Sequence, residues 1–186
     1  MSAHIWEYED WSVLKLCEVS EKIQDILDVS PKLGEMSVHE LCHLAKLNLA
    51  PVGIYIFADA ETNEILYVGK THGRSLQERM ISHIDHRDPV IGSPHLAQFV
   101  TKLIKTGTVK TREEAVDFIL GLKVLWMTFE PFNREEVKHI IAKVERKLMW
   151  NKCLDPKFIS ERFRGCESFS LKGVRFNLSL EEILGN

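Results

Sequence analysis

The chain of 186 residues can bury one substantial core, which suits a single domain with an added segment better than two full domains. Its 45% apolar and 27% charged residues argue against a disordered, collagen-like or coiled-coil protein, and no stretch stays apolar long enough to cross a bilayer. Acidic residues stand near the start, where a signal peptide would carry lysines. We therefore expect a cytoplasmic protein with no membrane partner, whose four scattered cysteines are reduced.

The net charge of −3 is distributed unevenly along the chain. Nine acidic and four basic residues give residues 1–51 a balance of −5, whereas ten basic and four acidic residues give residues 138–175 a balance of +6. Phenylalanines stand among the basic residues of the second region, as in surfaces that hold phosphates. A solvated helix face with core phenylalanines would explain the same pattern. The candidate DNA-binding residues are Arg162, Arg164, Lys172 and Arg175.

The N-terminal part of the chain is predicted to be helical. Apolar residues recur at helical spacing over 11–27. A second helix is expected to begin at Ser37, whose hydroxyl can cap it while Glu40 reaches back, and to end before Pro51. Residues 1–51 are therefore interpreted as an acidic helical extension.

A β-hairpin is predicted next. Residues 52–59 and 64–69 are rich in β-branched and aromatic residues and are joined by a polar turn, which would bring Tyr55 near Tyr67. A helix with a second capping pattern, Ser75 and Glu78, follows. Two helices, a buried strand and the longest helix complete the prediction: 94–104, 111–120, 123–130 and 133–151.

Three polar residues fall on or beside faces that should be apolar. Arg79 and His83 lie along the apolar stripe of the helix that begins near Ser75, and Glu145 lies at the edge of the stripe of the longest helix. Arg79 could extend past the edge of the core, and His83 could be a satisfied buried imidazole. Glu145 needs either an ion pair, with Arg79 or a lysine, or a bound cation.

Taken in order, these residues form a recognisable series. "GIY" at 53–55 is followed after eleven residues by "YVG" at 67–69, then by Lys70, by Arg79 and His83 on one helix, and by Glu145 on a later helix. The series resembles the GIY-YIG nuclease superfamily over residues 52–151. The resemblance implies an α/β (α+β) fold, a small three-stranded antiparallel sheet flanked by helices.

The resemblance also implies an activity, a DNA endonuclease that hydrolyses phosphodiester bonds with Mg²⁺ or Mn²⁺. Glu145 would hold the metal, Arg79 would contact the scissile phosphate, and Gly53 and Gly69 would let the backbone approach the substrate. Residues 152–186 would form a basic aromatic segment that packs on the nuclease domain. The implied catalytic residues are Tyr55, Tyr67, Lys70, Arg79, His83 and Glu145.

Two features of such a site stay open. Tyr55 can act as the base near neutral pH only if positive charge, from Lys70 or Arg79, stabilises its phenolate, and His83 is the rival base. The family also usually carries an asparagine beyond the glutamate. That asparagine usually stands about a dozen residues beyond the glutamate, in a segment that contains proline. No asparagine follows Pro156 at this distance, and Asn177 is the candidate replacement.

Other functions remain as alternatives. "HELCH" at 39–43 matches the H-E-x-x-H pattern of zinc metalloproteases, although the apolar face of that helix turns His39 and His43 away from the core. A nucleic-acid-binding module with a decayed catalytic site is a further alternative. The sequence does not fix DNA specificity or oligomeric state, and the acidic extension is a candidate contact for a partner protein or a second copy of the chain.

Overall fold

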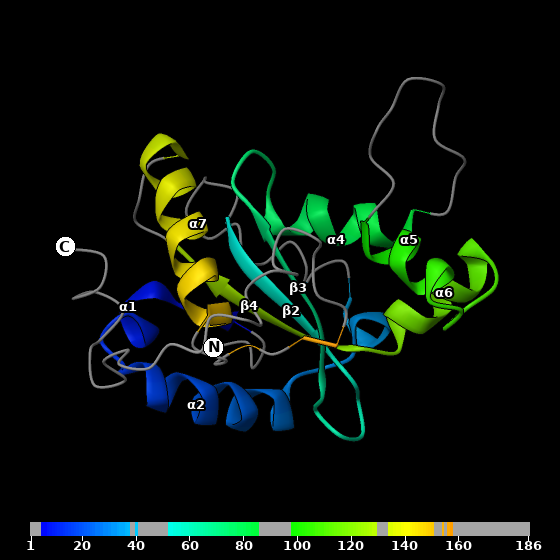
Figure 1. The fold of residues 1–186 in the computed structure, drawn as a ribbon, viewed down its shortest axis with the longest axis horizontal. Helices are drawn as coiled ribbons and strands as arrows, with labels where there is room; N and C mark the ends of the chain where they lie inside the picture. The colour runs from blue at the N-terminus through cyan, green and yellow to red at the C-terminus, as the bar shows by residue number, and fades with distance from the viewer. Residues whose placement is uncertain are drawn as a thin grey trace.

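A mixed four-stranded sheet forms the centre of the protein, in the strand order β1-β4-β2-β3, with helices on both sides (Figure 1). The predicted α/β class is therefore confirmed. No helix in the described part of the chain is long and apolar enough to cross a membrane. The computed structural model describes residues 5–37, 40, 52–85, 98–129, 134–150, 154, 156 and 157.

Three strands carry the motif residues and their neighbours. β2 (Gly53–Ala58) pairs antiparallel with both β3 (Ile65–Thr71) and β4 (Lys123–Thr128). β1 (Ile5–Trp6) adds a fourth strand, which runs parallel to β4. The prediction of a sheet with only three, antiparallel strands is wrong in this detail, because β1 is too short to show an alternating pattern.

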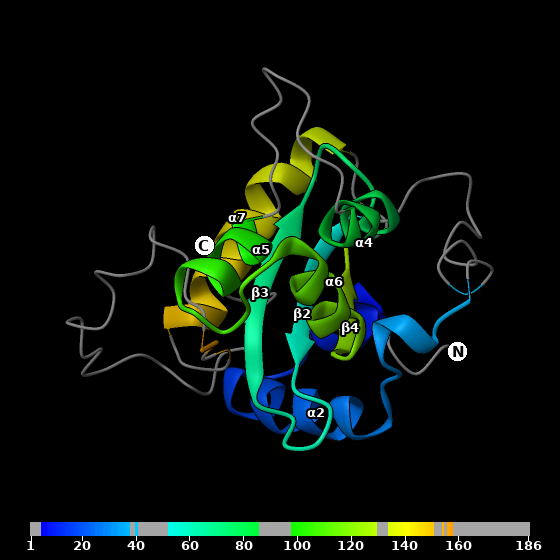
Figure 2. The ribbon, with the colours of Figure 1, turned by 90° about the vertical axis from the view of Figure 1, so that its right-hand side faces the viewer.

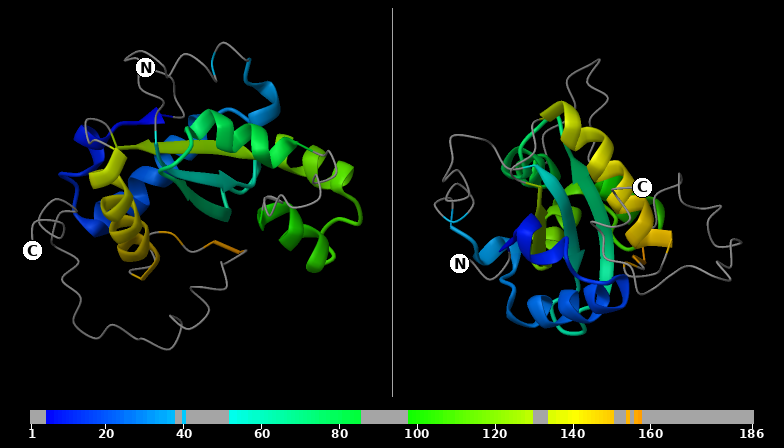
Figure 3. Two further views of the ribbon diagram at one scale, coloured as in Figure 1. Left: turned by 90° about the horizontal axis from the view of Figure 1, so that it is seen from above. Right: turned by 90° about the vertical axis from the view of Figure 1, so that its left-hand side faces the viewer.

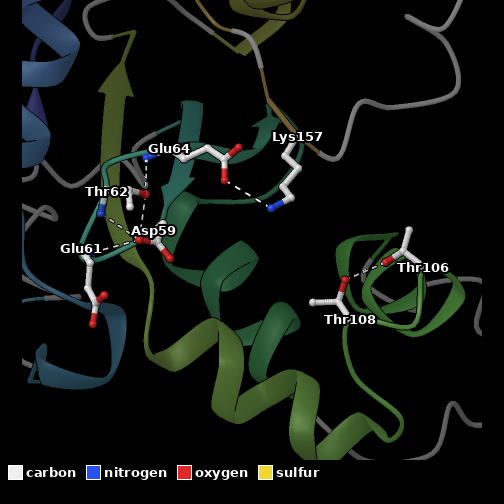
Figure 4. A network of polar contacts seen from close by, with 7 residues as sticks. All are labelled: Asp59, Glu61, Thr62, Glu64, Thr106, Thr108 and Lys157. Atoms are coloured by element: carbon white, nitrogen blue, oxygen red, sulfur yellow. Dashed lines mark hydrogen bonds and ion pairs between the residues drawn. The ribbon is translucent and has the colours of Figure 1, made fainter.

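The turn between β2 and β3 is held by Asp59 (Figure 4). Its carboxylate accepts the amide N–H of Glu61 at 3.0 Å and that of Thr62 at 2.9 Å, together with the Thr62 hydroxyl. The bond from the Thr62 amide is the largest of the contributions that lower the pKa of Asp59. Asn63 follows with a φ of 58°, a left-handed conformation that asparagine tolerates. These contacts confirm the predicted turn.

One face of the sheet is covered by α1 (Tyr8–Trp11), α2 (Leu16–Val29) and α7 (Arg134–Trp150) (Figures 1 and 3). Alternate residues of β2, Ile54 and Ile56, are fully buried against them. The amphipathic pattern of α7 explains its position, since its apolar stripe enters this core.

The opposite face is covered by α4 (Leu76–Ile84), α5 (Gln98–Lys105) and α6 (Arg112–Leu120), which gather on one side of the strands (Figure 2). The other alternate residues of β2, Tyr55 and Phe57, point into this second core. The sheet therefore separates two clusters, and every side chain of β2 belongs to one or the other.

The N-terminal segment contributes directly to the first core. Trp6 of β1 is buried, and the fully buried Trp11 donates its indole N–H to the Thr128 carbonyl oxygen at 3.2 Å. After α2, the short 3₁₀ helix η1 (Leu33–Glu35) is tied to the strand side by a bond from Leu33 N–H to the Leu122 carbonyl oxygen. The described residues of the expected extension thus share a hydrophobic core with the sheet.

Both predicted capping boxes are present. The Ser75 hydroxyl oxygen accepts the Glu78 N–H at 3.1 Å, and the Glu78 carboxylate accepts the Ser75 N–H at 2.7 Å. The same two bonds join Ser37 and Glu40, at 3.1 and 2.7 Å. Each box satisfies amide groups that a helix leaves without a partner, and the box at Ser75 stands at the start of α4.

Candidate active site

Tyr55 lies in the middle of β2 with no exposed surface. It pairs with Gly69 of β3. A Cβ atom on Gly69 would overlap the Tyr55 hydroxyl and Cζ atoms and would lie only 2.6 Å from Cε1. The Tyr55 ring therefore crosses β3 through the space that a side chain at position 69 would fill. The two halves of the sequence motif meet there.

Helix α4 brings two more predicted residues to the Tyr55 hydroxyl. Arg79 and His83 are four residues apart, so they project from the same helix face. The Arg79 Nε–H donates to the Tyr55 oxygen at 3.2 Å, and His83 Nε2 lies 2.8 Å from the same oxygen. His83 is fully buried, whereas Arg79 is partly exposed. One strand and one helix thus bring three polar groups together, with Arg79 and His83 both in contact with the Tyr55 oxygen.

Burial keeps both titratable partners neutral. Desolvation, with a smaller contribution from the charge of Arg79, lowers the pKa of His83 to about 3. Desolvation also raises the pKa of Tyr55, helped by the neighbouring Tyr67 phenol and opposed by Arg79. Arg79 alone therefore does not stabilise a phenolate at neutral pH.

The hydrogen-bond roles follow from these protonation states. A neutral imidazole accepts at one nitrogen only, so we assign the Tyr55 O–H as donor to Nε2 of His83. The His83 Nδ1 atom then carries the proton. It is buried and has no hydrogen-bond partner within the described residues. The cluster is consequently a chain in which Arg79 donates to Tyr55 and Tyr55 donates to His83.

Tyr67 lines the same cluster, as predicted. Its ring centroid lies 6.1 Å from that of Tyr55 and 5.8 Å from that of His83. Phe99 of α5 stacks on Tyr67 at 4.5 Å, and Phe57 meets the His83 ring edge-on at 5.3 Å. These two phenylalanines were not among the predicted site residues; they surround the imidazole with apolar surface and so account for its low pKa.

Lys70 and Glu145 form a second cluster, on the other face of the sheet. Lys70 pairs with Ile54, so its side chain leaves β3 on the face that α7 covers. Lys70 Nζ lies 2.6 Å from Oε2 of Glu145, and their side chains are 19% and 1% exposed. Of the two ion pairs considered for Glu145, the structure contains the one with a lysine, and Arg79 is bonded to Tyr55.

Glu145 is the proposed metal ligand, and its surroundings can be tested for that role. Among the described residues, no group of three or more His, Cys, Asp and Glu side chains is placed to hold a metal ion. Mg²⁺ does not require such a group, since it retains several waters and binds through one or two carboxylates. The ammonium of Lys70 already demonstrates that a cation fits beside this carboxylate. The donor chemistry of this one carboxylate therefore suits a hard divalent ion that takes its other ligands from water, provided that Lys70 turns away.

The two motif glycines are explained by contacts within the protein. A Cβ atom on Gly53 would overlap the carbonyl oxygen of Met127, which lies in the neighbouring strand β4. At Gly69 the space is filled by Tyr55. The close approach expected of a substrate is made at both positions by other parts of the chain.

The remaining predicted residues fall outside the described part of the chain. They belong to the basic C-terminal segment and to the H-E-x-x-H pattern, of which only Glu40 is described, as the capping partner of Ser37. Their positions stay predictions. They are Arg162, Arg164, Lys172, Arg175, Asn177, His39 and His43.

Comparisons with protein-family models, with curated proteins and with solved structures found no match for this chain. The resemblance to the GIY-YIG superfamily therefore stays a prediction from the motif residues. The cluster around Tyr55 and the ion pair of Glu145 are the physical basis for a function.

Proposed function

We propose that this chain is a DNA endonuclease that hydrolyses phosphodiester bonds with Mg²⁺ or Mn²⁺ at a GIY-YIG-type site. The observation that carries the proposal is the contact of the Tyr55 hydroxyl with both His83 Nε2, at 2.8 Å, and Arg79 Nε, at 3.2 Å. This arrangement combines groups that can move a proton with a permanent cation. The fold supports the proposal, because the motif residues of β2 and β3 lie on antiparallel strands and β4 pairs with β2 beside them.

Arg79 would bind the scissile phosphate. Its Nε–H is used by Tyr55, and the remaining guanidinium N–H groups can form charge-assisted bonds with phosphate oxygens. Arg79 is also the partly exposed member of the cluster, whereas Tyr55 and His83 are fully buried. A DNA phosphate would therefore approach from the Arg79 side.

Tyr55 and His83 would act in series as the base. Because Tyr55 is a neutral phenol, it can accept a proton from the attacking water only if it releases its own. His83 Nε2 is the acceptor at 2.8 Å. The water proton would move to the Tyr55 oxygen and the phenol proton to Nε2, which leaves an imidazolium beside Arg79. The negative phosphate held by Arg79 would offset that charge, so the transfer is coupled to substrate binding.

Glu145 would hold the metal ion, which when bound supplies a positive charge that stabilises the leaving oxygen. The basic residues of the C-terminal segment would hold the DNA backbone, and Asn177 would complete the site in place of the family asparagine. Association of two copies as a homodimer through the N-terminal segment would allow both strands to be cut, and another protein is the alternative partner of that segment.

The proposal is tested by cleavage of a supercoiled plasmid and of a branched DNA junction, with Mg²⁺, with Mn²⁺ or with EDTA. Wild type should cut only with metal. Tyr55→Phe removes the oxygen on which the cluster is built and should reduce cleavage about 10²- to 10⁴-fold, the usual range for a general base. Tyr8→Phe is the matched control, since Tyr8 belongs to the other core.

Two further variants separate this function from its alternatives. Glu145→Ala should abolish cleavage and leave DNA binding intact, whereas replacement of His39 and His43 by alanine should leave cleavage unchanged. Full activity of Tyr55→Phe, or cleavage by wild type in EDTA, would contradict the proposed chemistry. Loss of cleavage in a folded variant without His39 and His43 would instead favour zinc chemistry at "HELCH".

A nucleic-acid-binding module without catalysis is the second candidate. The observation that favours it is the closure of both clusters, since Tyr55 and His83 have no exposed surface and Glu145 is already paired with Lys70. Binding of DNA by wild type without cleavage in either metal ion would establish this function. A preference for the junction over the plasmid in the cleavage experiment would indicate recognition of DNA structure.

A further inference from the structure

The ion pair between Lys70 and Glu145 has properties of an exchangeable contact. Glu145 is 1% exposed and is fixed on α7, within the core that also contains Val144 and Leu148. Lys70 is 19% exposed and carries its charge at the end of a flexible stem of four carbons. The carboxylate is therefore the fixed partner, and the ammonium is the partner that can leave.

A buried carboxylate at this position is stabilised by a cation in contact with it. Removal of a charge from water costs several kcal/mol, and an opposite charge in contact offsets that cost. Lys70 Nζ supplies the charge at 2.6 Å. A divalent ion bound by the same carboxylate would stand close to the ammonium and repel it. The Lys70 ammonium and the divalent ion would therefore occupy the same position beside Glu145, and only one of them can be there at a time.

We propose that Lys70 is a built-in competitor of the divalent ion at Glu145, which the ion must displace before it can bind. This inference rests on the proposed function for the identity of Glu145 as the metal ligand. Lys70 thereby sets the metal affinity of the site and is released when metal binds. Gly69, which precedes Lys70 in β3, faces the Tyr55 ring on the opposite side of the sheet.

Measured Mn²⁺ affinity tests this competition without any DNA. If Lys70 occupied the position beside Glu145 for about nine tenths of the time, the ion would bind about tenfold more weakly than it binds a site that is always open. We therefore expect Lys70→Met to bind Mn²⁺ at least about tenfold more tightly than wild type, by titration of free Mn²⁺ with electron paramagnetic resonance. Lys70→Arg keeps the charge and should keep the weak affinity, and Glu145→Gln should not bind the ion.

Lys138→Met is the matched control for the change in net charge. Lys138 lies on the same helix as Glu145 but is exposed. Its loss should change the Mn²⁺ affinity less than about twofold, because exposed charges are screened. Equal affinities of wild type and Lys70→Met, or an equal gain in Lys138→Met, would overturn the proposal.

The wild-type protein gives a second test that does not depend on a variant that folds. Modification of lysines by an amine-reactive reagent, read by mass spectrometry, should increase at Lys70 when saturating Mn²⁺ is added and stay constant at Lys138. Unchanged labelling of Lys70 would overturn the proposed displacement.

These outcomes are distinct from those of the cleavage experiment. A protein that shows the competition but cuts no DNA would refute the nuclease and retain the inference. A protein that cuts DNA with Mg²⁺ but has the same Mn²⁺ affinity with and without Lys70 would do the reverse.

Discussion

The two faces of the central sheet accommodate buried polar groups in opposite ways. On the α4 face, burial keeps Tyr55 and His83 neutral, so that the cluster consists of uncharged donors and acceptors beside one partly exposed arginine. On the α7 face, Glu145 and Lys70 meet as a charged pair at 2.6 Å. The same desolvation cost is thus avoided by neutralisation on one face and by pairing on the other.

The difference matters for what each cluster can do. A neutral hydrogen-bonded chain can respond to a nearby charge by proton transfer, and a buried ion pair can respond by exchange of its mobile cation. The two clusters are linked through β3, where Gly69 and Lys70 are consecutive and face opposite sides of the sheet. Variants that alter one cluster at a time therefore separate the two forms of compensation.

The largest effect on stability is expected on the α7 face. Lys70→Met removes the cation that contacts a side chain with 1% exposure and should lower the free energy of unfolding by about 3 kcal/mol. Glu145→Gln should cost less, about 1 kcal/mol, because the partly exposed Lys70 can turn to water. Urea unfolding without divalent ions gives both values.

The double variant of Lys70→Met and Glu145→Gln sharpens this asymmetry. The double variant should be more stable than Lys70→Met alone and close in stability to Glu145→Gln, because it no longer contains a buried carboxylate that has lost its cation. A larger cost for Glu145→Gln than for Lys70→Met would contradict the assignment of Glu145 as the fixed partner.

The next effect concerns the packing of Tyr55 on the α4 face. Gly69→Ala places a Cβ atom where the Tyr55 ring lies and should cost about 2 kcal/mol, as overpacking of a core usually does. The ring would be displaced from Arg79 and His83, so DNA cleavage should fall with it. Thermal unfolding and the plasmid assay measure the two consequences.

Gly73→Ala is the control for this substitution. A Cβ atom on Gly73 would have no heavy atom within 4 Å, so this variant should keep both stability and activity. If Gly69→Ala were as stable and active as Gly73→Ala, Tyr55 would be free to move, and the rigid position inferred for its hydroxyl would be wrong.

Local signals in the sequence predicted a large part of the fold and several contacts of the candidate site. The boxes of Ser75 with Glu78 and Ser37 with Glu40 are formed as expected, because their partners are three residues apart and need no tertiary contact. Arg79 and His83 also converge as their helical spacing indicates.

Pairings that depend on strand register could not be predicted in the same way. A β-bulge lies between Phe57 and Ala58, so that Phe57 pairs with Tyr67 while Ala58 pairs with Ile65. Without this bulge, the pair of Ala58 and Ile65 would set the register, and all pairs from Phe57 to Gly53 would be shifted by one residue. Lys70 would then face α4 instead of α7. The partner of Glu145 is therefore visible only in the structure.

The smallest effect is a dependence of stability on pH that belongs to the α4 face. His83 has a pKa of about 3 in the folded protein and about 6.5 when unfolded, so the unfolded chain binds a proton first as pH falls. The stability linked to neutral His83 is complete above about pH 6.5 and is lost progressively toward about pH 3. Between about pH 7.5 and 5.5, its loss should amount to about 1.4 kcal/mol.

Urea unfolding at these two pH values isolates the contribution when wild type is compared with His83→Gln. The glutamine amide can keep a hydrogen bond with Tyr55 but does not titrate, so the decrease in stability should be smaller in this variant by about 1.4 kcal/mol. His72→Gln, which changes a histidine in the loop after β3 outside the cluster, is the comparison variant. Equal pH dependence in all three proteins would mean that His83 is not held neutral, and the contrast between a neutral α4 face and a charged α7 face would fail.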